Sequence, residues 1–167
     1  LGFEVVVSKP STRETYEKGQ FTIPSDTACY PAKLMHGHIE ELLEEGVPCI
    51  FYPCLTYNID EHQSDNHYNC PVVAYYAELL QGNVEELKKV KFFYPYLNLD
   101  SPKELARELL GKLNEFFGGG FTKAEVPEAV KQGFAAYDRY MEAIRQKGRE
   151  ALAQARRQHK RIMILSG

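Results

Sequence analysis

An alternation of short apolar runs with amphipathic segments constrains this chain more than any other feature. Runs rich in β-branched and aromatic residues lie at 3–8, 48–53 and 90–94, and a last one lies at 161–167. Segments with helical spacing, several of which begin at proline, separate these runs; they lie at 12–19, 31–45, 71–81, 101–117 and 122–159. Such alternation predicts an α/β fold with a mostly parallel sheet and helices on both faces.

The two helical segments between the last two strands predict a C-terminal helical part. We expect one domain over residues 1–167, with a cysteine-bearing α/β part at 1–100, a helical part at 101–160 and a final strand at 161–167. The first residue is Leu rather than Met, and the chain ends on an apolar run. We therefore expect the chain to be a segment of a longer polypeptide.

Composition narrows the class of protein. An apolar fraction of 44% and a charged fraction of 26% are those of a globular protein. The net charge of −3 argues against a nucleic-acid partner, and no apolar run approaches the roughly 20 residues of a membrane span. The chain is long enough to form a hydrophobic core without disulfide bonds, so its four cysteines indicate a reducing, cytoplasmic location.

Three of the four cysteines fall at equivalent places in the predicted fold. Cys29 and Cys70 stand at the starts of predicted helices, and Cys54 directly follows a predicted strand. In a parallel α/β sheet these places lie along one edge, where ligands bind. A helix N-terminus also favours thiolate over thiol. Three thiolates could hold a cubane iron–sulfur cluster and leave one iron with a replaceable ligand.

Spacing alone leaves alternatives open. A zinc site is one, because four histidines lie in the same region, namely His36, His38, His62 and His67. Disulfides are another, and a scaffold or interaction domain with structural cysteines is a third. His36 and His38 flank Gly37 and are expected to point in different directions; His62 and His67 are expected in a solvated loop. Cys49 lies within a strand and is interpreted as a core residue.

Two stretches resemble a known family. They are Cys29-Tyr30-Pro31-Ala32-Lys33 and Tyr68-Asn69-Cys70-Pro71, within a similarity that covers most of the chain. The family is the uncharacterised domain of large CoA-substrate-specific enzyme activases, which is related to 2-hydroxyacyl-CoA dehydratase subunits and to double-cubane-cluster proteins.

The resemblance implies a Rossmann-like domain whose Cys29, Cys54 and Cys70 ligate an iron–sulfur cluster, 4Fe–4S or larger. It also implies partners: the remainder of the parent chain, an ATP-dependent activase that supplies low-potential electrons, and an acyl-CoA as substrate for reduction or radical dehydration. The fragment alone is expected to be inactive. No ATP site is expected, because Gly118-Gly119-Gly120 precedes no Lys-Ser/Thr pair and is interpreted as a helix break.

Further residues near the cysteines are candidates to line a pocket. Lys33 could offset the charge of a cluster, and Ser25 and Asp26 are expected to cap the helix that follows Cys29. The remaining candidates are Tyr30, His36, Tyr68 and Asn69.

Overall fold

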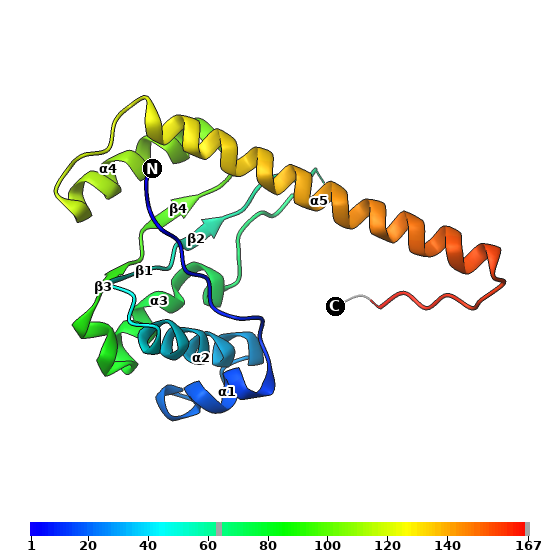
Figure 1. The fold of residues 1–167 in the computed structure, drawn as a ribbon, viewed down its shortest axis with the longest axis horizontal. Helices are drawn as coiled ribbons and strands as arrows, with labels where there is room; N and C mark the ends of the chain where they lie inside the picture. The colour runs from blue at the N-terminus through cyan, green and yellow to red at the C-terminus, as the bar shows by residue number, and fades with distance from the viewer. Residues whose placement is uncertain (63–64, 166–167) are drawn as a thin grey trace. The chain divides into compact units, whose positions relative to one another are not determined.

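The computed structural model describes residues 1–62 and 65–165. Its contacts group the chain into two compact units, Leu1–Pro127 and Glu128–Gly167. The first unit holds the strands and most of the helices (Figure 1). The second unit contains most of α5 (Glu125–Arg157), which is one continuous helix. The single domain expected over residues 1–167 stays a prediction.

Two parallel strand pairs follow each other along the chain and together form a two-stranded ribbon. β1 (Cys49–Phe51) pairs with β3 (Lys91–Phe93), and β2 (Cys54–Tyr57) pairs with β4 (Tyr96–Asn98). Pro53 lies between β1 and β2, and Pro95 lies between β3 and β4. The Tyr52 amide donates to the Phe93 carbonyl, and the Cys54 amide donates to the Pro95 carbonyl, both at 2.9 Å. The hydrogen-bond ladder between the two chain segments therefore continues past Pro53 and Pro95. Proline has no backbone N–H, so neither residue leaves a donor unpaired.

Helices cover both faces of the ribbon, as predicted. α2 (Tyr30–Glu44) and α3 (Pro71–Asn83) lie on one side, and α4 (Pro102–Phe117) lies on the other (Figure 1). Alternate strand residues supply the two cores, because successive side chains of a strand point to opposite faces. Ile50 and Phe92 belong to the first core, which lies on the side of α2 and α3. Cys49 and Phe93 pack in the second core, which lies on the side of α4.

The other short helices and turns follow their sequence signals. α1 (Arg13–Gly19) begins at Thr12 in a capping box and continues into the 3-10 turn η1 (Gln20–Thr22). A second 3-10 turn, η2 (Glu85–Lys89), leads into β3. Ser101 caps α4, and Gly118 ends it in the left-handed conformation with φ of 80°. Gly118 to Gly120 therefore act as the predicted helix break.

The predicted first strand, at 3–8, is wrong. This segment is exposed and pairs with no described strand; instead, the Phe3 ring contacts those of Phe117 and Phe121 at 5.5 and 5.7 Å. Farther along, the Lys9 amide donates to a Glu41 carboxylate oxygen of α2 at 3.1 Å. A β-branched run favours extended backbone but does not supply a partner strand.

The last strand and the long loop also differ from the prediction. Residues 161–165 form no strand, and residues 166–167 of the predicted strand lie outside the described residues. The predicted loop at 54–69 begins with a strand, β2, and its residues 63–64 are likewise not described. β2 and β4 are each too short to be predicted as strands alone, and their mutual pairing defines them.

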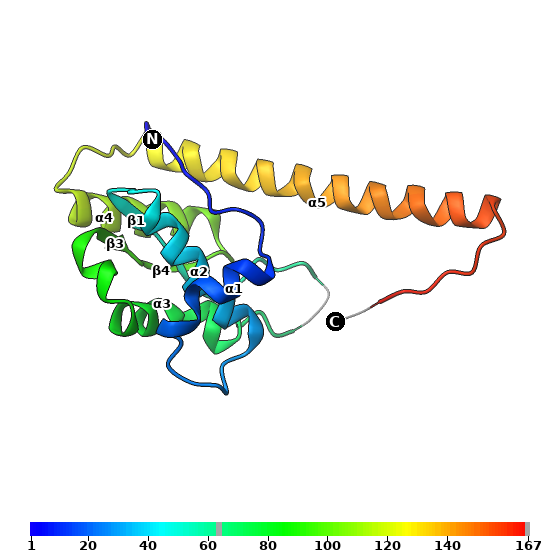
Figure 2. The ribbon, with the colours of Figure 1, turned by 60° about the horizontal axis from the view of Figure 1, so that its bottom comes forward.

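A backbone contact between α1 and α2 fixes these two helices against each other, as their adjacency in Figure 2 reflects. A Cβ added at Gly37 would lie 1.7 Å from the Thr15 carbonyl oxygen, and one added at Gly19 would lie 2.2 Å from the Gly37 nitrogen. Only glycine permits this approach.

Gly37→Ala should destabilise the protein by about 1–3 kcal/mol or more, because the backbones of α1 and α2 must separate. Gly111→Ala in α4 is the matched control: a Cβ there meets nothing within 4 Å. It should leave stability unchanged or raise it by about 0.5–1 kcal/mol. Urea unfolding measures both changes, and equal stability of the two variants would contradict the contact.

Candidate functional site

Cys29 and Cys70 occupy the same structural position in two helices. Each is the N-cap residue, with φ of −63° and ψ of 156° for Cys29 and 158° for Cys70, and each is followed by proline in the first turn. Both are exposed, and neither thiol caps its own helix. The unpaired amides of a helix N-terminus stabilise a nearby negative charge. Both sulfur atoms therefore stand beside unpaired backbone amides.

Cys54 has a different environment. It begins β2, has no exposed surface, and belongs to the first core together with Tyr76 and Ala77. Burial raises the pKa of the Cys54 thiol, and a hydrogen bond from the Ala77 amide partly opposes that shift.

Pairing of the segment before Cys70 with β2 brings Cys70 toward Cys54. Tyr57 and Tyr68 form an antiparallel bridge, and the Asn69 amide donates to the Thr56 carbonyl at 3.0 Å. The Asn69 side chain donates to the Leu55 carbonyl at 2.9 Å. Asn69, a predicted pocket residue, therefore holds the two cysteine-bearing segments together.

Two tyrosines pack in the same core as Cys54, namely the buried Tyr76 and the partly buried Tyr52. Burial raises the pKa of Tyr52 to about 12 and also raises the pKa of Tyr76. Within residues 1–62 and 65–165, however, no three His, Cys, Asp or Glu side chains are arranged to hold a metal ion.

The other predicted pocket residues take several roles. Lys33 donates to the Asp26 carbonyl at 2.9 Å, which ties α2 to the preceding loop. The expected caps at Ser25 and Asp26 are wrong: Cys29 is the N-cap, and the Ser25 hydroxyl instead accepts from the Thr27 amide at 3.2 Å. Tyr30 and Tyr68 are exposed and contact other aromatic rings, those of Tyr16 and Tyr57.

The histidines do not gather into one group. His38 contacts the Ser11 hydroxyl at 2.9 Å, away from His36, as the Gly37 spacing predicted. His62 and His67 both lie near Asp60, at 3.2 and 3.6 Å. His62 is exposed as expected, but the His67 side chain is only 15% exposed and contacts the Tyr57 ring edge-on.

His36 is the centre of a buried contact that the sequence did not reveal. Its ring is fully buried, with Nδ1 at 2.8 Å from the Thr22 hydroxyl and Nε2 at 3.0 Å from the Tyr76 hydroxyl. Burial lowers the His36 pKa, so the ring is neutral. Gly19 and Gly37 are the sequence signal that could have indicated this burial, because glycine at both positions lets α1 and α2 pack closely beside His36.

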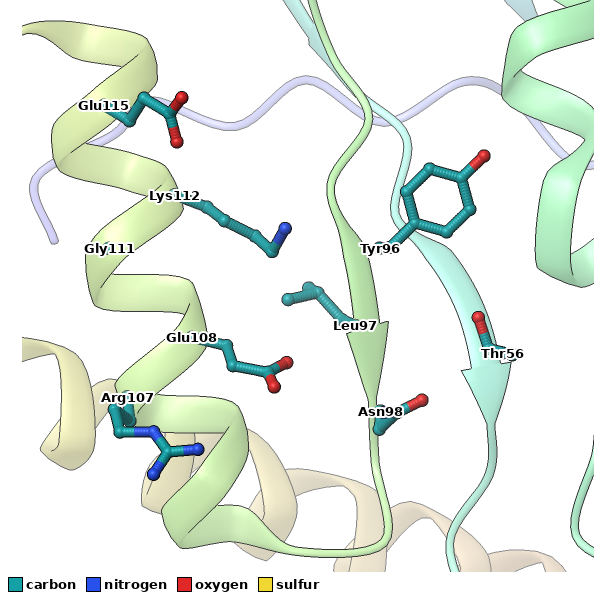
Figure 3. A pocket seen from close by; sticks show the side chains of 9 residues that line it. All are labelled: Thr56, Tyr96, Leu97, Asn98, Arg107, Glu108, Gly111, Lys112 and Glu115. Carbon is teal, nitrogen blue, oxygen red and sulfur yellow. The ribbon is translucent and has the colours of Figure 1, made fainter.

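A hollow lies on the α4 side of the ribbon (Figure 3). It has a volume of about 550 Å³ and mixes two basic with two acidic side chains along α4. No cysteine lines it. The lining residues are Thr56, Tyr96, Leu97, Asn98, Arg107, Glu108, Gly111, Lys112 and Glu115.

Fold and site together define an α/β domain with cysteine-capped helices beside a parallel ribbon. The chain belongs to the family described as CoA enzyme activase uncharacterised domain, which it matches over residues 1–167. No curated protein and no solved structure matches it. Among the described residues, no helix has the length and apolar character needed to cross a membrane.

The buried neutral His36 should make stability depend on pH. Its pKa is lower in the folded state, so the unfolded chain binds more protons below about pH 6.5. The free energy of unfolding should therefore fall as the pH drops from about 6.5, by at most about 1.4 kcal/mol per pH unit from this group. His36→Gln should show a shallower loss in urea unfolding between about pH 5 and 7; an unchanged slope would contradict the assignment.

The four cysteines should differ in how readily their thiols react with a reagent in solution. Cys29 and Cys70 are exposed, whereas Cys54 is buried and Cys49 is half-buried. Alkylation of the native protein followed by peptide mapping should label Cys29 and Cys70 first, and should label Cys54 only after denaturation. Rapid native labelling of Cys54 would contradict its place in the core.

Proposed function

We propose that this domain is an iron–sulfur redox module in which Cys29, Cys54 and Cys70 are the protein ligands of a 4Fe–4S or larger cluster. The recurrence of cysteine as the N-cap residue of two helices, together with a third cysteine at the start of β2, supports the proposal. Two of them are N-cap residues with nearly the same backbone angles, and Asn69, next to Cys70, is hydrogen-bonded to β2, the strand that begins at Cys54. Thiolates are the ligands that such clusters require.

The chemistry of the donors suits the cluster. Two exposed thiols at helix N-termini can approach a bound group, whereas the buried Cys54 supplies a fixed point. The described arrangement is not yet a closed metal site, so binding requires Cys29 and Cys70 to move toward Cys54. A cluster held by three thiolates would transfer single electrons and would leave one iron with a replaceable ligand.

The proposed partners follow from the family. The domain would receive low-potential electrons from an ATP-dependent activase and act with the remainder of a longer chain on a substrate such as an acyl-CoA. Within this chain, Tyr52 and Tyr76 keep their hydroxyl protons, because burial disfavours phenolate. They would orient bound groups rather than act as charged bases.

Iron and acid-labile sulfide should be found after anaerobic purification or reconstitution, near four of each per chain, which is the content of one cubane. Cys29→Ala and Cys70→Ala should each lose the visible absorption and most of the iron, since each removes one of three ligands. Both positions are exposed, so the variants should fold.

Cys49→Ala is the matched control. Cys49 packs in the second core, on the opposite face from Cys54, and should not affect iron binding. Stoichiometric zinc in place of iron would support the zinc-stabilised alternative. If the folded protein binds neither metal under these conditions, the proposed iron–sulfur module is wrong, and a scaffold or interaction domain is the remaining alternative.

A further inference from the structure

Apolar and small residues recur along α5 at alternating intervals of three and four residues. This alternation continues from Val130 to Ala155 and places the residues in one stripe along the helix, which is the pattern of a coiled-coil seam. Val130 is only 7% exposed, so the part of the stripe open to a partner begins one step later. We call this part the α5 seam, and it consists of Phe134, Tyr137, Met141, Ile144, Gly148 and Ala151.

The α5 seam is accessible along its length. Ile144 is 47% exposed, Gly148 and Ala151 are exposed, and Phe134 and Met141 are half-buried. Two further apolar side chains flank the seam, with Tyr140 63% exposed and Leu152 38% exposed. A continuous exposed apolar stripe of this kind marks a surface for another protein.

The residues of the seam change from large to small along the helix. Phe134 and Tyr137 lie at its N-terminal end, whereas Gly148 and Ala151 lie at its C-terminal end. A Cβ added at Gly148 would meet nothing within 4 Å, so packing within the described residues does not require glycine there. Glycine also weakens a helix interior relative to alanine. Gly148 therefore leaves a space that a side chain from another molecule can fill.

We propose that the α5 seam pairs with the α5 seam of a second copy of this chain in an antiparallel coiled coil. When Met141 lies opposite Ile144 of the second copy, Tyr137 lies opposite Gly148 and Phe134 lies opposite Ala151. Each large ring then meets a small residue, and the two medium-sized side chains meet at the centre. Such matching fills the interface without voids or crowding.

A parallel pair in register would not achieve this matching. Phe134 would meet Phe134 at one end, and Gly148 would meet Gly148 near the other. The first layer would be crowded, and the second would contain a void. The size gradient of the seam therefore favours the antiparallel arrangement.

The charges of α5 favour the same arrangement. Residues 125–142 carry four acidic and two basic side chains, whereas residues 143–157 carry one acidic and five basic side chains. Antiparallel pairing brings the acidic half of one helix beside the basic half of the other. Asp138 and Arg145 each directly follow a seam residue, so the register above places Asp138 beside Arg145 of the second copy.

The match of both size and charge within one helix identifies the partner as a second copy. A two-fold axis through the centre of the seam makes every contact twice, as in other symmetric dimers. A different partner would need to reproduce both gradients in reverse order. This interaction surface is independent of the cysteines and of the proposed iron–sulfur cluster.

Sedimentation equilibrium of the full 167-residue chain tests the pairing. The mass should rise with concentration toward twice the 19.1 kDa of one chain. Ile144→Asp should remain a monomer, because it places a carboxylate in the apolar seam. Ala153→Asp is the matched control: Ala153 is exposed and lies on the side of α5 away from the seam, so this variant should associate like the wild type. Circular dichroism should show the same helix content in both variants.

Charge reversal tests the antiparallel register. Asp138→Arg should weaken the dimer, because Arg139 aside it would face Arg145 of the second copy, and adding Arg145→Asp should restore it. A dimer that Ile144→Asp leaves intact, or a double variant no tighter than Asp138→Arg alone, would overturn the proposal. A wild-type monomer at every concentration would also overturn it and would leave the remainder of the longer chain as the occupant of the seam.

Discussion

The hydrogen bond between His36 and Tyr76 joins the two helices that begin at Cys29 and Cys70. α2 and α3 are far apart in sequence, and this buried polar contact fixes how they face each other within an otherwise apolar core. A buried donor or acceptor without its partner costs about 1–3 kcal/mol. Alternative packings of α2 on α3 that break the contact are therefore disfavoured, and the positions of both cysteine-capped N-termini depend on it.

The parallel ribbon supplies the second constraint. Parallel strands need a crossover, and α3 provides it between β2 and β3. Because strand residues alternate between faces, the ribbon separates Cys49 from Cys54 although only four residues lie between them. The prolines at 53 and 95 interrupt each strand without breaking the ladder, since the amides beside them still pair. Cys54 therefore starts a new strand in the core next to α3.

Several features could be predicted from local signals. Proline after Cys29 and Cys70, the Ser101 cap and the glycines after α4 each act within one turn of the chain, and the structure has a helix boundary at each. The strands predicted at 3–8 and 161–165 do not form, because a strand exists only where a partner strand pairs with it and local signals do not supply that partner. β2 and β4 were missed because their pairing compensates for weak individual signals.

The sequence by itself determined the α/β class, the helix starts, and the placement of three cysteines at the ends of elements, because propensity, capping and alternation are short-range effects. Only the tertiary structure decided that His36 is buried between Thr22 and Tyr76. It also decided that Cys54 lies in the core whereas Cys29 and Cys70 remain exposed. These outcomes depend on packing between residues 14 to 40 positions apart, which no local pattern encodes.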